Sequence, residues 1–339
     1  MNINDLKKID SKKMYQVYDR WPEAARNSYD GKLEKFDVKD IDHIVFAGMG
    51  GSGSIGDVIG SILSKEDIHV SNVKGYLLPK TVDSKTLVIG TSISGNTIET
   101  VHALQSVKKS SATAVGFSSG GKIEEYCKNN NIFFQKIPMI HSPRASFVNF
   151  LFSILNIMEA IIPIKPIDVN EAILKLEKTK NMINSENLTD ENEAIGIAKF
   201  VNDITCIYYP AGLHASAVRF KNSLQENAKI HCMVEDVIES SHNGIVPWEN
   251  KSLVKPVLIQ GDDDHIKTKS RWKILEEFFK SKEIECKKVN SVEGNILSKI
   301  TNLIYLLDYS TIYTSILKNI DPSPVSSIDF IKKKLEMEE

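Results

Sequence analysis

Hydrophobic positions in this chain fall into short apolar runs that alternate with longer amphipathic stretches. Short runs are typical of strands buried on both faces, and stretches with a period near 3.6 residues are typical of helices. In the first half, these patterns predict strands at 41–47, 70–77, 86–90, 113–117 and 132–137, and helices at 55–63, 97–108 and 123–128. This alternation indicates a mostly parallel sheet with helices on both faces.

The second half repeats this organisation after a helical stretch. An apolar segment at 145–162 predicts a buried helix, and a charged amphipathic stretch follows at 170–200. Beyond it, the pattern predicts strands at 203–209, 230–234, 257–260 and 285–289, and helices at 296–317 and 326–335. We therefore expect an α/β fold of two tandem sandwich domains, 1–163 and 201–339, each a mostly parallel sheet flanked by helices, with a helical linker at 164–200.

The composition narrows the range of partners. At 339 residues and 42% hydrophobic, the chain is large enough for two cores. Its 42 basic and 44 acidic residues provide no overall field that would attract nucleic acid or an anionic membrane. The most apolar stretch, 147–164, contains Asn149, Asn156 and Glu159, which are costly at bilayer depth, so we expect no membrane segment.

The cysteines and the N-terminal residues suggest where the protein works. Its four cysteines are widely spaced without a C-x-x-C pair, which favours free thiols in a reducing compartment. The first ten residues mix charges and lack the apolar core of a secretory signal. The sequence therefore predicts a cytoplasmic protein.

We expect neither a metal nor a cofactor. The eight histidines show no H-x-H or H-E-x-x-H spacing, and the cysteines do not cluster. The segment Asp262–His265, with three consecutive aspartates, is the one place that could attract a divalent ion, although such a run after a strand is typical of an exposed turn.

Two loops rich in serine and glycine, 48–54 and 92–97, each follow a predicted strand and precede a helix. Backbone N–H groups at a tight turn, hydroxyl groups and the positive end of a helix all favour a dianion. We expect the phosphate of a ligand at Ser92, Ser94 and Thr97, with Gly50, Gly51 and Ser52 close to the rest of that ligand.

The first loop has two other interpretations. Gly48, Gly50 and Gly53 have the G-x-G-x-x-G spacing of a dinucleotide-binding loop. That fold usually places a carboxylate at the end of the second strand, whereas the run 70–77 ends without one. Alternatively, the glycines serve only to permit a tight turn.

The loop motifs G-x-G-G-S-G and S-x-S-G-N-T-x-E-T resemble the sugar isomerase domain, which binds phosphosugars with such loops. From Gly48 to Leu335, the chain resembles the bifunctional phosphoglucose/phosphomannose isomerases found in archaea. In the second half, the resemblance rests on Ser142–Ser146, Gln225–Lys229, His242–Asn243 with Trp248, and Asp321–Pro324 followed by Ile328 and Lys332. The chain departs from that family at Gln225, where asparagine is common, and at Gly244, where glutamate is usual.

The resemblance implies roles for several residues. Interconversion of an aldose and a ketose phosphate through a cis-enediolate needs one base that serves both carbons, and Glu226 falls where the family carries this glutamate. His242 falls at the ring-opening histidine, which the family supplies from the neighbouring subunit, so a homodimer is implied. Arg144 and Lys332 (or Lys333) match two cations that stabilise developing charge.

The residue pattern alone leaves these roles open. Glu226 lies on a predicted helix whose other side carries an apolar stripe, so it could equally be a solvated surface acid beside Arg219 and Asn222. The apolar stripe is Ala217, Phe220, Leu224 and Ala228. His242, in a polar segment, could be an ordinary loop residue. Ser323 or Ser326 is a candidate for accommodating rotation of the bound enediolate.

The function that the resemblance implies is metal-independent interconversion of glucose 6-phosphate or mannose 6-phosphate with fructose 6-phosphate. Two alternatives remain. One is a phosphosugar-binding regulatory module without chemistry, which would not need Glu226 or His242. The other is an enzyme acting on an amino-sugar phosphate.

Overall fold

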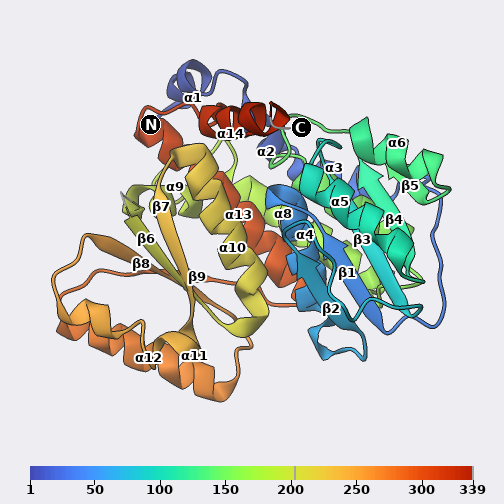
Figure 1. Cartoon of the computed structure of the whole chain (residues 1–339). Coiled ribbons are helices and arrows are strands. Elements are labelled where there is room, and N and C mark those ends of the chain that lie inside the picture. Colours follow the sequence, from blue (N-terminus) through green and yellow to red (C-terminus); the bar gives the residue numbers. More distant parts are fainter. Residues whose placement is uncertain (202–203, 338–339) are drawn as a thin grey trace.

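Two parallel β-sheets organise the chain in this computed structural model, which describes residues 1–201 and 204–337 (Figure 1). The first sheet has the order β2-β1-β3-β4-β5 and comprises β1 (His43–Ala47), β2 (His69–Val73), β3 (Thr86–Ser92), β4 (Thr113–Ser118) and β5 (Phe133–Lys136). The second has the order β7-β6-β8-β9 and comprises β6 (Ile204–Tyr209), β7 (His231–Asp236), β8 (Val254–Gln260) and β9 (Lys287–Asn290). Paired strands run parallel throughout the described residues, so the predicted α/β fold with two parallel sheets is confirmed.

Helices cover both faces of the first sheet. Val45 and Val88 point to the face covered by α5 (Ile98–Ser106) and α6 (Gly121–Asn129). The alternate strand residues, such as Ile44, point to the opposite face and join the core formed with α4 (Gly50–Ile62) and α7 (Phe147–Ile157). Strands buried on both faces explain the continuous apolar runs in the sequence.

The second sheet is covered in the same way. Its outer face packs Tyr208 and Leu258 against residues of α11 (Val237–Ser240) and α12 (Ile266–Ser281). Its inner face joins α10 (His214–Ser223) and α13 (Ile296–Leu317) in the core that also includes α4 and α7. Figure 1 shows α4, α10 and α13 between the two sheets.

The N-terminal helices pack around α13. They are α1 (Ile3–Ile9), α2 (Met14–Asp19) and α3 (Trp21–Tyr29), joined there by α8 (Pro166–Ile183) and α9 (Glu193–Phe200). The ring of Trp21 stacks on Tyr18 at 4.5 Å and on Tyr305 at 5.5 Å between ring centroids. The start of the chain is thus packed against a helix near its end.

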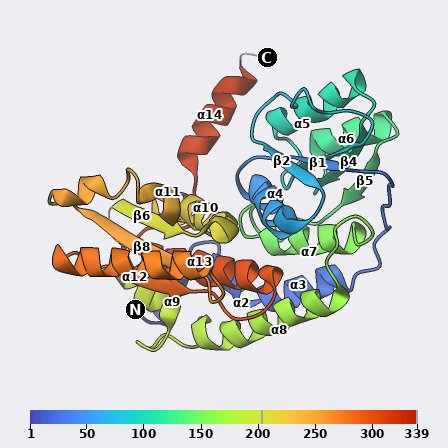
Figure 2. The same cartoon turned by 90° about the horizontal axis from the view of Figure 1, so that it is seen from below.

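The last helix, α14 (Ser326–Glu336), projects away from the rest of the molecule (Figure 2). It exposes four large apolar side chains, Ile328, Phe330, Ile331 and Leu335. Among the described helices, none is long and apolar enough to cross a membrane.

Several predicted boundaries are wrong. The strand expected at 70–77 ends at Val73, and the helix expected at 145–162 spans only Phe147–Ile157. The stretch at 170–200 forms two helices, α8 ending at Ile183 and α9 beginning at Glu193. Between them, the backbone N–H and the hydroxyl of Ser185 donate hydrogen bonds to Asp19. The predicted start of β6 at residue 203 lies outside the described residues.

Candidate active site

The first glycine-rich loop merges with the helix that follows it. α4 begins at Gly50, five residues earlier than predicted, so Gly51 and Ser52 lie in its first turn. Gly50 has a φ of +53°, in the left-handed region that favours glycine. A Cβ on Gly53 would lie 2.7 Å from the carbonyl oxygen of Gly48, so only glycine allows this close packing.

Three hydroxyl groups cluster in the second loop, between β3 and α5. Ser92 Oγ lies 2.8 Å from Thr97 Oγ1 and 3.4 Å from Ser94 Oγ, and it accepts a hydrogen bond from the Gly95 N–H at 3.1 Å. Thr97 occupies the N-cap position of α5, yet its side chain makes no capping hydrogen bond within the described chain. Hydroxyl groups and uncapped helix N–H groups are suited to an oxyanion.

Ser52 joins the two loops. Its buried Oγ accepts a hydrogen bond from the Ile93 N–H at 3.0 Å. The buried hydroxyls of Thr91 and Thr100, beside this junction, have no hydrogen-bond partner among the residues the structure describes. The loops follow β1 and β3, where the strand order of the sheet reverses, which is where doubly wound α/β folds bind ligands.

Arg144 is buried at the centre of the site. It lies in a turn before α7 rather than in the helix, because α7 begins at Phe147. Its Nη1 donates to Glu226 Oε2 at 3.1 Å, its Nε donates to Asn227 Oδ1 at 2.6 Å, and its Nη2 donates to the Ser323 carbonyl oxygen at 3.0 Å. Arg144 thus links the first half of the chain to the second half and to the C-terminal segment.

Glu226 lies on a turn of π-helix, Leu224–Ala228, that continues α10. Single π-turns inside helices occur frequently at functional sites. The carboxylate of Glu226 borders a cavity of about 530 Å³ that also reaches Gly50 of the first loop. The cavity is lined by Gly50, Lys74, Val218, Lys221, Asn222, Gln225, Glu226, Lys229, Pro324, Val325, Ser326, Ser327 and Ile328.

Arg219 does not share the solvent-facing side of the helix with Glu226, so that expectation is wrong. Its side chain is only 2% exposed and pairs with Asp308 of α13, from Nη2 to Oδ2 at 2.7 Å. The predicted apolar stripe is confirmed, since Ala217, Phe220, Leu224 and Ala228 are buried. The π-turn rotates the residues beyond Ser223 relative to a regular helix, so the sequence spacing misplaces Glu226 relative to Arg219.

Lys229 is a site residue to which the sequence analysis gave no role. It has a φ of +56° and ends the π-turn, and its Nζ donates to the carbonyl oxygens of Glu226 at 2.7 Å and of Asp321 at 3.1 Å. Burial lowers the pKa of Lys229, and the nearby charge of Arg144 lowers it further. Its left-handed conformation leaves no signal in the sequence.

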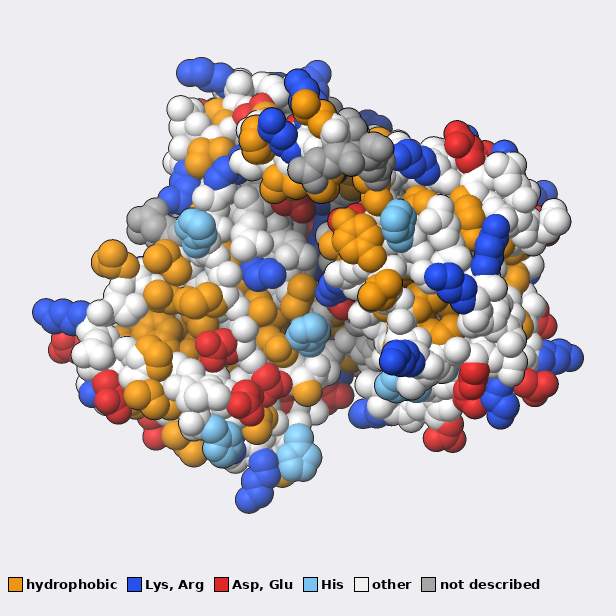
Figure 3. Space-filling view, viewed as in Figure 1, with side chains coloured by type: hydrophobic (Ala, Val, Ile, Leu, Met, Phe, Trp, Pro, Cys, Tyr) orange, Lys and Arg blue, Asp and Glu red, His pale blue; other side chains and the backbone are white. Residues whose placement is uncertain are grey.

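His242 lies apart from these residues within the single chain. It is exposed on the turn that follows α11, and it is not among the described residues that line the cavity at Glu226. Exposed apolar side chains of Met233, Ile238 and Val246 belong to the same part of the chain. Figure 3 shows apolar side chains gathered on the face over β7 and α11.

Lys332 also lies outside the cavity. It is exposed on α14, as are Lys333 and Lys334, whereas Ser326 at the start of that helix lines the cavity. Ser323 is buried, and its hydroxyl has no partner within the described chain.

The aspartates that could have attracted a metal interact with other groups. Asp263 pairs with Lys299, and Asp264 Oδ2 accepts hydrogen bonds from the Gly261 N–H at 3.0 Å and from Trp272 Nε1 at 2.8 Å. Over residues 1–201 and 204–337, no three histidine, cysteine or acidic side chains are grouped as metal ligands would be.

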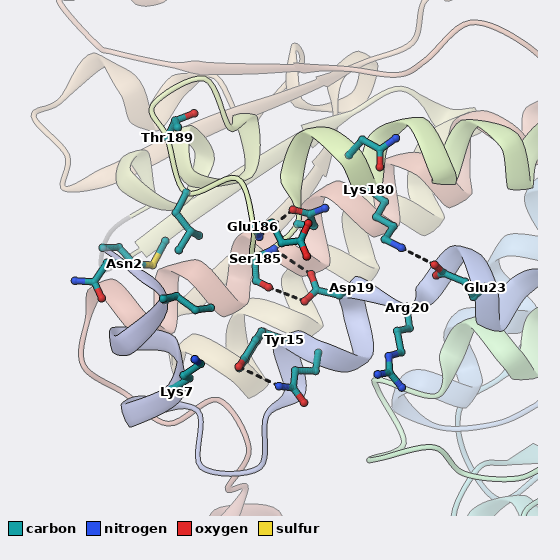
Figure 4. A pocket seen from close by; sticks show the side chains of 16 residues that line it. Asn2, Lys7, Tyr15, Asp19, Arg20, Glu23, Lys180, Ser185, Glu186 and Thr189 are labelled. Atoms are coloured by element: carbon teal, nitrogen blue, oxygen red, sulfur yellow. Dashed lines mark hydrogen bonds and ion pairs between the residues drawn. The ribbon is translucent and has the colours of Figure 1, made fainter.

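A second, larger hollow of about 1110 Å³ lies between α2 and α8, away from the predicted site residues (Figure 4). Some of the charged and polar side chains in its lining contact one another. Lys180 forms an ion pair with Glu23, and Ser185 Oγ donates to Asp19 at 2.7 Å. None of the predicted site residues is among its described lining residues.

Comparison with known proteins identifies both halves as the same kind of domain. Residues 38–161 match the SIS domain family, and residues 190–335 match the family of the bacterial phospho-glucose isomerase C-terminal SIS domain. Over 334 residues, the chain is 31% identical to a bifunctional phosphoglucose/phosphomannose isomerase of Caldicellulosiruptor bescii, covering 95% of this chain and 98% of that one. The chain belongs to the family of bifunctional phosphoglucose/phosphomannose isomerases, which confirms the resemblance.

Two further proteins are similar to this chain. A D-glucosamine-6-phosphate 4-epimerase of Sulfolobus acidocaldarius is 27% identical over 258 residues, covering 74% of this chain and 78% of that one. The crystal structure of a hypothetical protein from Thermus thermophilus matches with a TM-score of 0.75, covering 99% of this chain and 94% of that one at 12% identity. The second similarity concerns the fold alone.

Proposed function

We propose that this protein is an aldose–ketose isomerase that interconverts glucose 6-phosphate or mannose 6-phosphate with fructose 6-phosphate in the cytoplasm, without a metal. Membership of the isomerase family supports the proposal. The observation that carries it is the position of Glu226, whose carboxylate lies 3.1 Å from the buried Arg144 and borders a cavity shared with Gly50.

In this proposal, Ser92, Ser94 and Thr97 hold the phosphate, and Gly50, Gly51 and Ser52 lie along the sugar. Ser52 contacts the second loop and Gly50 reaches the cavity, so a substrate anchored at the hydroxyl cluster extends towards Glu226. Glu226 removes the proton from C2 and returns it to C1 on the same face. Arg144 stabilises the negative charge that develops on the enediolate oxygen.

Acceptance of both C2 epimers requires rotation about the C2–C3 bond of the bound enediolate. Ser326 lines the cavity, and the Ser323 hydroxyl is buried without a partner in the described chain, so both are candidates for this adjustment. Replacement of Ser326 by leucine should then reduce turnover of mannose 6-phosphate more than that of glucose 6-phosphate. An equal loss with both substrates would contradict this role.

The proposed enzyme is a homodimer in which His242 opens the sugar ring in the partner subunit. Its position supports this, because His242 is exposed beside the apolar side chains of Ile238 and Val246, a surface suited to association. The apolar side of α14, including Phe330, is a second such surface. Lys332 or Lys333, on α14, is proposed to approach the substrate in that assembly.

Mixing two inactive variants tests the shared site. Glu226→Gln and His242→Ala should each be inactive alone. Dissociated and reassociated in equal amounts, they should recover about a quarter of wild-type activity, since half the dimers are mixed and each mixed dimer has one complete site. A mixture that stays inactive although mass spectrometry detects mixed dimers would show that His242 does not act across the interface.

The isomerase reaction itself is tested by proton exchange and by substrate. In deuterated water, fructose 6-phosphate formed by the enzyme should carry solvent deuterium at C1, and recovered glucose 6-phosphate should carry it at C2. Turnover of glucosamine 6-phosphate alone would favour the amino-sugar alternative. The similarity to the D-glucosamine-6-phosphate 4-epimerase is the reason for including this substrate. Phosphosugar binding without turnover would favour the regulatory module.

A further inference from the structure

A fully buried ion pair lies behind the candidate site. The side chain of Arg219 is 2% exposed and that of Asp308 is 0% exposed. The guanidinium donates to Asp308 Oδ2 from Nε at 2.9 Å and from Nη2 at 2.7 Å. Asp308 also accepts hydrogen bonds from Ser223 Oγ at 2.6 Å and from the Tyr18 hydroxyl at 3.2 Å. The carboxylate therefore ties α2 and α10 to α13.

The guanidinium of Arg219 also contacts both parts of the site in the first half of the chain. Its Nη2 donates to the backbone carbonyl oxygen of Arg144 at 2.6 Å. Its Nη1 lies against the first loop, since a Cβ on Gly51 would be 3.3 Å from it. The plane of the group lies over the ring of Phe147, with its central carbon 4.8 Å from the ring centroid. One side chain thus fixes the backbone of Arg144 relative to the start of α4.

The surroundings of Arg219 keep its positive charge in place. Burial is the largest influence and by itself would lower the pKa of Arg219, but the charge of Asp308, the hydrogen bond to Asp308 and the contributions of Tyr18 and Glu226 together outweigh burial and raise the pKa above its usual value. Arg219 therefore stays protonated and keeps its hydrogen bonds to Asp308 and to the Arg144 carbonyl oxygen.

Stability alone is a weak explanation for this pair. Removing two charges from water is costly, and replacing a buried ion pair with neutral side chains of similar volume often leaves a protein equally stable. A pair that serves only the fold could therefore be replaced without consequence for the site.

We propose that Arg219, anchored by Asp308, is a positioning residue of the reaction. It sets the backbone of Arg144 and the Gly50–Gly51 turn so that the Arg144 guanidinium meets Glu226. This inference rests on the proposed isomerase function. It means that Arg219 of α10 and Asp308 of α13 align reacting groups that lie outside these two helices.

The test uses a variant in which no charge is left buried alone. Arg219→Met combined with Asp308→Asn removes both charges and keeps an acceptor for Tyr18 and Ser223. Because a misplacement of about 1 Å can cost about 100-fold in rate, kcat should fall by about 100-fold while KM changes much less. Such a split between kcat and KM is not expected from a loss of stability alone.

Two further variants sharpen the test. Arg219→Lys keeps the charge without the planar fork, so it should also lower kcat while changing KM little. The control is Lys299→Met, which removes a different buried cation, one that lies on α13 and pairs with Asp263. It should leave kcat and KM unchanged even if the protein becomes less stable.

A folded double variant with wild-type kcat would overturn the inference and leave the isomerase proposal intact. If wild-type enzyme turned over no hexose phosphate, the isomerase proposal would fail instead. In that case, a crystal structure of the double variant tests the positioning role. There, separation of Arg144 Nη1 from Glu226 Oε2 beyond the wild-type 3.1 Å, with loss of the hydrogen bond, supports the inference, and a retained contact overturns it.

Discussion

The two sheets share a topology, yet their corresponding loops are used differently. In the first sheet, the loops after β1 and β3 bring the hydroxyl groups of Ser52, Ser92 and Thr97 together. The corresponding loops of the second sheet follow β6 and β8. There the carboxylate of Asp264 accepts hydrogen bonds from the Gly261 N–H and the Trp272 indole. The chain supplies its own anion in one half and leaves hydroxyl groups for a ligand in the other.

The second half contributes to the site through a helix rather than through strand ends. Glu226 lies on the π-turn that continues α10, and Lys229 closes that turn. The fold thus offers an anion site at the corresponding loops of both sheets. The local sequence decides which of the two sites is free for a ligand. The proposed division is that the first half binds the substrate and the second half transforms it.

The largest expected effect tests the role of the second half. Glu226→Gln should lower kcat by about 1000-fold, because the proton-transferring base is lost, and should change KM little. Steady-state assays with both hexose phosphates measure this. The control Glu239→Gln, at an exposed acid of α11 in the same half, should retain full activity. Retention of most of the rate by Glu226→Gln would break the proposed division.

The next effect compares one glycine from each half. Gly95 has a φ of +77°, and a Cβ there would lie 1.8 Å from the Gly120 carbonyl oxygen, so Gly95→Ala should cost about 3 kcal/mol of stability. Gly212, in the loop after β6, has no atom within 4 Å of an added Cβ, so Gly212→Ala should be nearly neutral. Urea unfolding measures both, and equal losses would contradict the comparison.

A third test concerns the two possible anion sites directly. Ser92→Ala and Thr97→Val should each raise the KM for hexose phosphate by about tenfold to 100-fold, because hydrogen bonds to a charged group are lost. Asp264→Asn should leave KM unchanged and lower stability, since it weakens the contacts to Gly261 and Trp272. An increase in KM for Asp264→Asn would place ligand binding in the second half as well.

The smallest effect compares one histidine from each half. Burial lowers the pKa of His43 and of His214 below the ordinary 6.5, so the folded protein protonates these rings less readily than the unfolded chain does. The stability they contribute is complete above about pH 6.5 and is lost as the pH falls towards their lowered values. The urea concentration at the unfolding midpoint should therefore decrease as the pH is lowered from about 7.5 to about 5.5. His43→Gln and His214→Gln should each flatten part of this slope, and unchanged slopes would contradict the assignment.

Much of the fold was predictable because its strands are buried on both faces. The runs at 86–90 and 257–260 predicted β3 and β8 within a few residues. Errors arose where tertiary contacts override the local pattern. β2 ends before Lys74 because that lysine turns to pair with Asp57 at 2.7 Å, a contact that hydropathy cannot reveal.

The site was only partly accessible from the sequence. The hydroxyl loops were recognisable because their residues are adjacent in the chain. The expectation that Arg219 shares the polar side of its helix is wrong because its partner, Asp308, is remote in sequence. The π-turn that follows α10 also changes the helical phase of Glu226 relative to Arg219. Lys229 was missed because its role depends on backbone carbonyl groups that become neighbours only in the folded chain.

The packing of α2 and α3 against α13 constrains how the protein is made. Tyr18 and Trp21 leave the ribosome early, but Tyr305 and Tyr309, against which they pack, are synthesised late. Domains generally fold as they emerge, the N-terminal one first. The first sheet can therefore form while its leading aromatic side chains stay exposed and open to chaperones. A chain truncated before α13 would leave Tyr18 of α2 without Tyr309, whereas Trp21 of α3 would keep its contact with Phe147 of α7.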